Sequence, residues 1–136
     1  MIAYPDSSFL YSIYLLDKHS AQATEYLKQK NEPLCIGSLL HFEFCQAVRF
    51  AIARKGLSEK VGLNALTDFH NDLSKGVVTL IFCKWSIVHQ KANLLSEHYT
   101  IQQGYRTLDI LHIATALTLG AKEFLTFDKN QAKLAR

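Results

Sequence analysis

The sequence predicts an α/β fold in which helices cover both faces of a short parallel sheet, giving three layers. Four short apolar segments alternate along the chain with longer segments whose apolar residues recur at helical spacing. The 136 residues are 49% hydrophobic and 20% charged, a composition that provides one core and excludes disorder. We therefore treat residues 1–136 as a single domain.

The four predicted strands are short apolar runs, each followed by polar or breaker residues. They cover residues 2–5, 34–36, 77–82 and 124–127. The third run is also rich in β-branched residues. Because a helical segment separates every successive pair, we expect these strands to be parallel.

The predicted helices are bounded by capping and breaker residues. They cover residues 9–16, 20–30, 38–54, 58–75, 86–102, 108–119 and 128–134. Ser58 is a typical N-cap, and glycines follow three of the helices, at Gly76, Gly104 and Gly120. In a parallel sheet covered by helices, ligands bind at the carboxyl ends of the strands, so we expect chemistry there.

The chain shows no sign of membrane insertion or secretion. No apolar run reaches the roughly 18 residues of a membrane helix. The first apolar stretch lacks a basic flank and is interrupted by Asp6, unlike a signal peptide. The three cysteines, Cys35, Cys45 and Cys83, form no C-x-x-C pair, which favours reduced, buried thiols in a cytoplasmic protein over disulfides or a zinc ribbon.

Two acidic residues follow predicted strands, Asp6 after the first and Asp128 after the last. If these two strands are neighbours, both carboxylates project into the same crevice. The alternative interpretation is that each aspartate simply caps the helix that follows it.

Two further acids, Glu43 and Asp109, lie within apolar helical segments. A buried carboxylate costs several kcal/mol unless a partner, a shared proton or a metal neutralises it. Plain salt bridges with Arg49 or Arg106 are the alternative. His112, one turn beyond Asp109, is predicted to be a packed, hydrogen-bonded core residue rather than a zinc ligand.

The charge balance suggests a polyanionic partner once these four acids are set apart. The chain has 15 Lys and Arg against 12 Asp and Glu, a formal net charge of +3. Without the four acids, 15 minus 8 leaves +7 on the rest of the chain. A basic surface around an oxygen-lined acidic hole suits a polyanion approaching Mg²⁺ or Mn²⁺.

Three other classes of acidic-site protein fit poorly. A phosphoacceptor receiver domain needs adjacent acids after its first strand, and Asp6 stands alone. A phosphatase of the D-x-D-x-T kind fails because Ser8 occupies the second acidic position. A nucleoside triphosphatase needs a G-x-x-x-x-G-K-[ST] loop, which the sequence lacks.

Four segments, in order over nearly the whole chain, resemble PIN-domain ribonucleases of the VapC toxin type. They are YPDSSFL at 4–10, SLLHFEF at 38–44, GYRTLDILHIATAL at 104–117, and the segment from GA to TFD at 120–128. The last two are the most specific. The resemblance implies a PIN-like fold and a cytoplasmic Mg²⁺- or Mn²⁺-dependent endoribonuclease of a toxin–antitoxin pair.

The resemblance assigns the catalytic and metal-binding roles to the four acids already identified: Asp6, Glu43, Asp109 and Asp128. We expect three hydroxyl residues to support them: Ser7, Ser8 and Thr126. Candidate contacts to RNA phosphates are Arg49, Arg106 and Lys129. Expected partners are an RNA substrate, an antitoxin protein and a second copy of the chain in a homodimer.

Two departures from the family pattern leave an alternative function open. Many members carry a further acid just after the fourth motif, where this chain has Lys-Asn-Gln at 129–131. Members also usually continue into a fifth strand, which we expect to be missing here. The alternative is a catalytically weak or inactive PIN-fold module that binds RNA or assembles with proteins.

Overall fold

The computed structural model describes residues 2–136. Its strands are β1 (Ala3–Pro5), β2 (Leu34–Ile36), β3 (Val78–Leu80) and β4 (Glu123–Leu125). All pairings are parallel and the order is β3-β2-β1-β4, so the first and last strands along the chain are neighbours. The register pairs Ala3 with Glu123 and Pro5 with Leu125, which aligns the carboxyl ends of β1 and β4.

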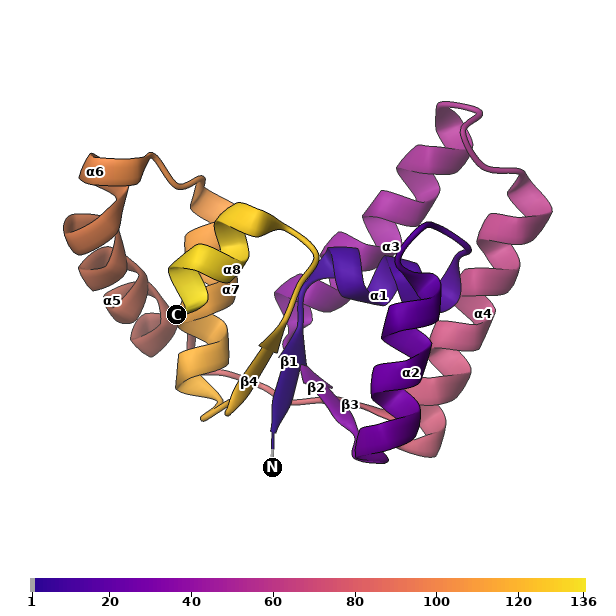
Figure 1. The fold of residues 1–136 in the computed structure, drawn as a ribbon, viewed down its shortest axis with the longest axis horizontal. Helices are drawn as coiled ribbons and strands as arrows, with labels where there is room; N and C mark the ends of the chain where they lie inside the picture. Colours follow the sequence, from indigo (N-terminus) through magenta and orange to yellow (C-terminus); the bar gives the residue numbers. More distant parts are fainter. Residues whose placement is uncertain (1) are drawn as a thin grey trace.

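The helices form two groups on either side of the sheet (Figure 1). They are α1 (Ser7–Tyr14), α2 (Ser20–Lys30), α3 (Ser38–Ala53), α4 (Glu59–Lys75), α5 (Trp85–Leu95), α6 (Ile101–Gln103), α7 (Thr107–Thr118) and α8 (Lys129–Ala135). A π-helical turn, η1 (Ser96–Thr100), joins α5 to α6. Helices α1 to α4 lie on one side and α5 to α8 on the other, which confirms the predicted three-layer α/β fold.

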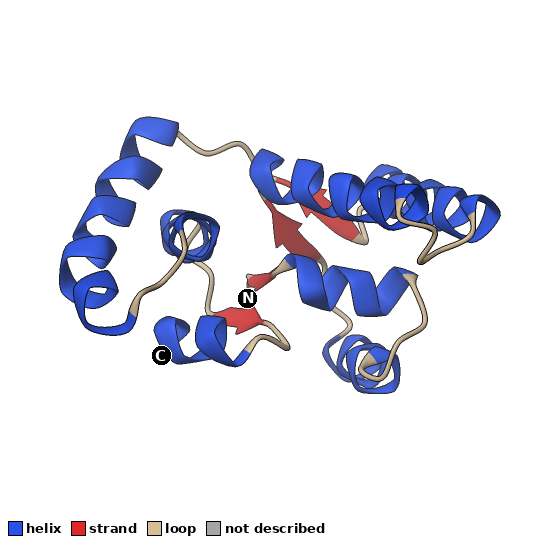
Figure 2. Cartoon of the chain, turned by 90° about the horizontal axis from the view of Figure 1, so that it is seen from above, coloured by secondary structure: helices blue, strands red, loops and turns tan. Residues whose placement is uncertain are grey.

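The main core lies between the sheet and the first four helices. Its fully buried side chains include Tyr4, Leu10, Ile36, Phe44 and Phe69. A smaller cluster joins α7 and α8 on the other side of the sheet. Figure 2, which looks from above, shows the strands enclosed between these two groups. No helix within residues 2–136 has the length and apolar character needed to cross a bilayer.

Helices α3 and α4 pack closely because of their local sequence. The Ser58 hydroxyl accepts a hydrogen bond from the amide of Val61 and so caps α4. Gly76 ends α4 in a left-handed conformation, with φ of 79°. Gly62 allows the close approach, since a Cβ there would lie 2.5 Å from Cδ1 of Ile52.

The structure corrects three predicted boundaries. The strand predicted over 77–82 is limited to Val78–Leu80, and Phe82 beyond it is 82% exposed. The helix predicted over 86–102 is interrupted by η1, for which the sequence carries no Gly or Pro signal. The last strand begins one residue earlier than predicted and ends at Leu125, because only 123–125 pair with β1.

Candidate active site

A cavity of about 510 Å³ opens at the carboxyl ends of β1 and β4. The parallel pairing of these strands brings the segments after them together, and α3 and α7 complete the wall. All four predicted acids line the cavity: Asp6, Glu43, Asp109 and Asp128. The other polar lining residues are Ser7, Ser8, Arg106, Thr107, His112 and Gln131.

Asp6 is the most deeply buried of the four acids, at 4% exposed. Its Oδ1 accepts hydrogen bonds from the Ser8 hydroxyl at 2.6 Å and the Phe9 amide at 3.0 Å, so it caps α1 as well as facing the cavity. Its Oδ2 accepts a short hydrogen bond from the Thr126 hydroxyl. Burial raises the pKa of Asp6, and these hydrogen bonds only partly oppose that rise.

The loop after β4 is tied to the loop after β1 by two hydroxyls. The Thr126 hydroxyl, which donates to Asp6, accepts the amide hydrogen of Asp128 at 2.9 Å. The Ser8 hydroxyl likewise donates to Asp6 and accepts the amide hydrogen of Phe127 at 3.1 Å. These bonds fix the position of Asp128 relative to Asp6.

Glu43 points from α3 toward α7, where its Oε2 lies 3.0 Å from Nε2 of His112. His112 is 2% exposed, and its Nδ1 lies 2.9 Å from the Tyr4 hydroxyl. Burial alone would raise the pKa of Glu43. The hydrogen bond and charge of His112, together with Ser7, outweigh burial and hold that pKa below its usual value. Glu43 is therefore an ionised carboxylate held in place by α7.

Asp109 and Asp128 both line the cavity and interact electrostatically. Burial and the charge of Asp128 raise the pKa of Asp109, while Arg106 partly offsets that rise. Asp128 caps α8 through its Oδ1, which accepts from the amides of Asn130 at 2.8 Å and Gln131 at 3.0 Å. The side chain of Gln131 in turn donates to the backbone carbonyl of Asp109 at 2.9 Å.

The donor set fits a hard divalent cation. The converging groups are carboxylate oxygens, which Mg²⁺ and Mn²⁺ prefer over the nitrogen and sulfur ligands typical of zinc. Within residues 2–136, Oδ2 of Asp128 accepts no hydrogen bond and remains free for a ligand. Among the described residues, no three of these carboxylates have oxygen atoms that all lie within 4.8 Å of one another.

Of the three residues predicted to contact RNA phosphates, one lines the cavity and two lie outside its lining. Arg106 lines the cavity. Lys129 is exposed at the start of α8, beside Asp128 but outside the lining. Arg49 is exposed on α3 and acts electrostatically on His41 and Cys45 instead. Neither Arg49 nor Arg106 forms a salt bridge with a cavity acid within the described residues, so that alternative is wrong.

Three contributors to the site were not predicted from the sequence. Tyr4 and His112 connect the sheet to Glu43, and Gln131 fixes the backbone at Asp109. His112 was predicted to be a packed and hydrogen-bonded core residue, which is confirmed, but its link to Glu43 was not foreseen. No local spacing signals these contacts, since Tyr4 and His112 are 108 positions apart.

Comparison with known families identifies the chain as a PIN domain. The sequence model of the PIN domain family matches residues 3–136, so the protein belongs to that family. PIN domains are generally nucleases that use divalent metals. A search of curated proteins found no significant match.

Two solved structures share the fold. VapC20 from Mycobacterium tuberculosis, described as a sarcin–ricin loop cleaving toxin, superposes with a TM-score of 0.70 at 15% identity, over 96% of this chain and 93% of its own. PAE2754 from Pyrobaculum aerophilum superposes with a TM-score of 0.61 at 16% identity, over 100% of this chain and 81% of its own. At these identities the likeness establishes the fold, as the resemblance predicts.

Proposed function

We propose that this protein is a metal-dependent endoribonuclease that hydrolyses RNA phosphodiester bonds and acts as the toxin of a toxin–antitoxin pair. The observation that supports the proposal best is the cavity at the ends of β1 and β4, which four carboxylates line within a PIN domain. Carboxylates placed at the ends of parallel strands are suited to hold a cation against a bound phosphate.

Asp6 and Asp109 are the proposed direct ligands of Mg²⁺ or Mn²⁺, and Glu43 and Asp128 complete the set. When bound, such a cation activates water and neutralises charge on the phosphate. Burial raises the pKa of Asp6 and of Asp109, so the ionised form of each carboxyl is less favourable than it would be in water. A bound divalent cation would stabilise both carboxylates and offset the repulsion between Asp109 and Asp128.

The other groups have distinct proposed roles in hydrolysis. Glu43, held ionised by His112, orients the attacking water by accepting its hydrogen bond. Arg106 binds a phosphate of the RNA at the cavity wall. Attack in line with the 3′-oxygen would leave a 5′-phosphate and a 3′-hydroxyl.

An RNA substrate and two protein partners follow from this proposal. The structural neighbour VapC20 is described as a toxin that cleaves an RNA loop, which supports RNA by analogy of fold. Exposed apolar side chains on the helices that follow β1 and β2 favour an antitoxin and a homodimer. They include Phe42 and Phe50 on α3, which are 60% and 54% exposed, and Leu16 in the segment between α1 and α2 is 95% exposed.

A binding module without catalysis is the second candidate. It is favoured by residues 129–131, which carry no further acid, and by the spread of the four carboxylates around the cavity. Such a module would hold RNA or a protein partner at the same face without cutting it.

Cleavage of a structured RNA pool separates the two candidates. We expect cleavage with Mn²⁺ or Mg²⁺ that EDTA abolishes. Asp109→Asn should abolish it as well, whereas Asp68→Asn on the exposed face of α4 serves as the matched control and should retain it. Cleavage that survives both EDTA and Asp109→Asn would come from a contaminant. No cleavage by the wild type, together with no Mn²⁺ binding by calorimetry, would overturn the nuclease proposal.

A further inference from the structure

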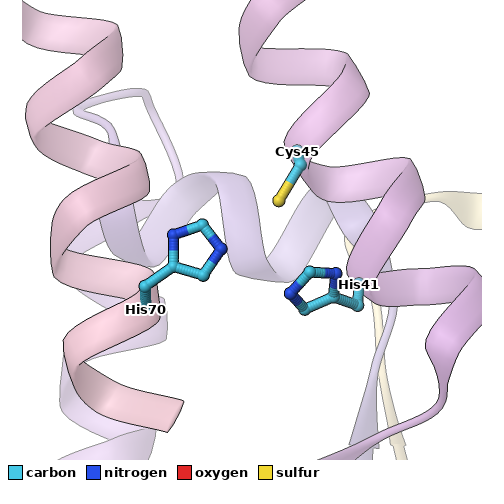
Figure 3. A group of neighbouring side chains, drawn as sticks. All are labelled: His41, Cys45 and His70. Atoms are coloured by element: carbon cyan, nitrogen blue, oxygen red, sulfur yellow. The ribbon is translucent and has the colours of Figure 1, made fainter. Parts of the chain in front are cut away.

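A second group of metal-ligating side chains lies between α3 and α4 (Figure 3). It consists of His41 and Cys45 from α3 and His70 from α4. One ligand atom from each lies within 4.8 Å of the other two. The sequence predicts reduced, buried thiols and gives no sign of this group, because His70 is remote in sequence from the other two.

This group is separate from the acidic cavity although both use α3. His41 and Cys45 are four residues apart and therefore share one face of the helix. Glu43 is two residues from each, which turns it by about 200° to the opposite face. None of the three side chains lines the acidic cavity.

The three side chains point toward one another and are free to bind a ligand (Figure 3). The His41 and His70 rings have centroids 5.6 Å apart. The ring of Phe69 packs against both, with centroids at 5.5 and 5.7 Å. Within residues 2–136, no hydrogen bond or salt bridge occupies the imidazole nitrogens or the thiol.

We propose that His41, Cys45 and His70 form a transition-metal site that binds Zn²⁺ and joins α3 to α4. Two imidazoles and one thiolate match the ligands that zinc prefers, and they discriminate against Mg²⁺. Zinc bonds of about 2.0 to 2.3 Å require the ligand atoms to close by about 1 Å, a movement that side-chain rotation supplies. His70 is exposed, so water completes the tetrahedron.

Metal binding at this site is linked to loss of the thiol proton, because zinc binds the thiolate. Burial lowers the pKa of His41, with His70 and Arg49 adding to the effect, which favours the neutral imidazole that binds metal. Burial raises the pKa of the Cys45 thiol, while Arg49 works in the opposite direction. Zinc binding therefore releases the thiol proton, and the charge of Arg49 limits the affinity for the cation while favouring the thiolate.

Cobalt titration of the metal-free protein tests the proposal. Co²⁺ bound by a thiolate gives a charge-transfer absorption that carboxylate-bound Co²⁺ lacks. Co²⁺ bound in the acidic cavity therefore does not contribute to this absorption. We expect this absorption in the wild type, its loss on adding Zn²⁺, and its persistence in excess Mg²⁺. Zn²⁺ should also raise the Tm of the wild type.

Matched variants identify the ligands. Cys45→Ser should abolish the absorption, and His70→Gln, an exposed substitution that spares the core, should weaken Co²⁺ affinity at least tenfold. Cys83→Ser and His98→Gln should bind as the wild type does. The proposal is overturned if the wild type gives no thiolate absorption, if Cys45→Ser retains it, if Cys83→Ser loses it, or if Zn²⁺ raises the Tm of His70→Gln as much as that of the wild type.

Discussion

The Tyr4 hydroxyl lies 2.9 Å from Nδ1 of His112, and this contact joins β1 to α7 in the interior of the protein. The ionised Glu43 carboxylate can only accept, so Nε2 of His112 carries a proton toward it. The other ring nitrogen, Nδ1, is the partner of the Tyr4 hydroxyl. A residue of a buried strand thereby fixes the orientation of the histidine that holds Glu43 at the cavity.

Tyr4→Phe should destabilise the protein. The change removes a hydroxyl and leaves Nδ1 of His112 buried without a partner, which costs about 1–3 kcal/mol in free energy of unfolding. Urea denaturation measures this loss. Tyr11→Phe is the control, because the Tyr11 hydroxyl forms no hydrogen bond to residues 2–136 and its loss should change stability by less than about 0.5 kcal/mol. Equal stability of the two variants would contradict the role of the buried pair.

Thr126→Val should weaken the metal site without altering any of the four acids. The hydroxyl of Thr126 donates to Asp6 and accepts from the amide of Asp128, so its removal frees both residues at once. We expect Mn²⁺ affinity, measured by calorimetry, to fall by about 10–100-fold. Thr126→Ser keeps the hydroxyl and should bind Mn²⁺ within a few-fold of the wild type. If Val and Ser variants bind alike, the hydroxyl does not position the acids.

The fold was predictable because its signals are local. Apolar periodicity, caps such as Ser58 and stops such as Gly76 set the order of the elements. The end of the third strand was misplaced because pairing stops at Leu80, which depends on the length of its neighbour β2. The π turn at Ser96–Thr100 has no composition signal, so a continuous helix was the natural expectation.

The candidate site was predictable only in part, for a related reason. An acid after a strand or inside an apolar helix is conspicuous in sequence, and all four such acids line one cavity. The groups that hold them are ordinary in sequence. His112 reaches Glu43 across 69 positions, and His70 approaches Cys45 only because α3 and α4 pack together. Contacts of this kind arise from tertiary packing rather than from spacing.

The free energy of unfolding of Asp109→Asn, relative to that of the wild type, should increase as pH rises. The raised pKa of Asp109 means that the metal-free native state binds more protons than the unfolded state above the ordinary aspartate pKa of about 3.9. Stability from this group is therefore present at low pH and lost as pH rises through the raised value. At neutral pH the variant also lacks the repulsion from Asp128.

Denaturation in EDTA at several pH values measures the difference in free energy of unfolding between Asp109→Asn and the wild type. We expect it to grow by up to about 1 kcal/mol between acidic and neutral pH, since Asp109 is only partly buried. Asp68→Asn, at an exposed position on α4, should show a difference that does not grow with pH. A constant difference for Asp109→Asn would mean that its carboxyl titrates alike in both states.

Arg106→Ala should weaken RNA binding, whereas Arg49→Ala should not. Both side chains are exposed arginines, but Arg106 lines the acidic cavity and Arg49 lies on the part of α3 near His41 and Cys45. Loss of one phosphate contact reduces the slope of log affinity against log salt by about 0.7 for a single strand.

Fluorescence anisotropy across a salt series, with Asp109→Asn in the background, measures RNA binding without cleavage. We expect the smaller slope for Arg106→Ala and the parent slope for Arg49→Ala. Equal effects of both would mean that RNA follows the general positive surface rather than entering the cavity beside Arg106.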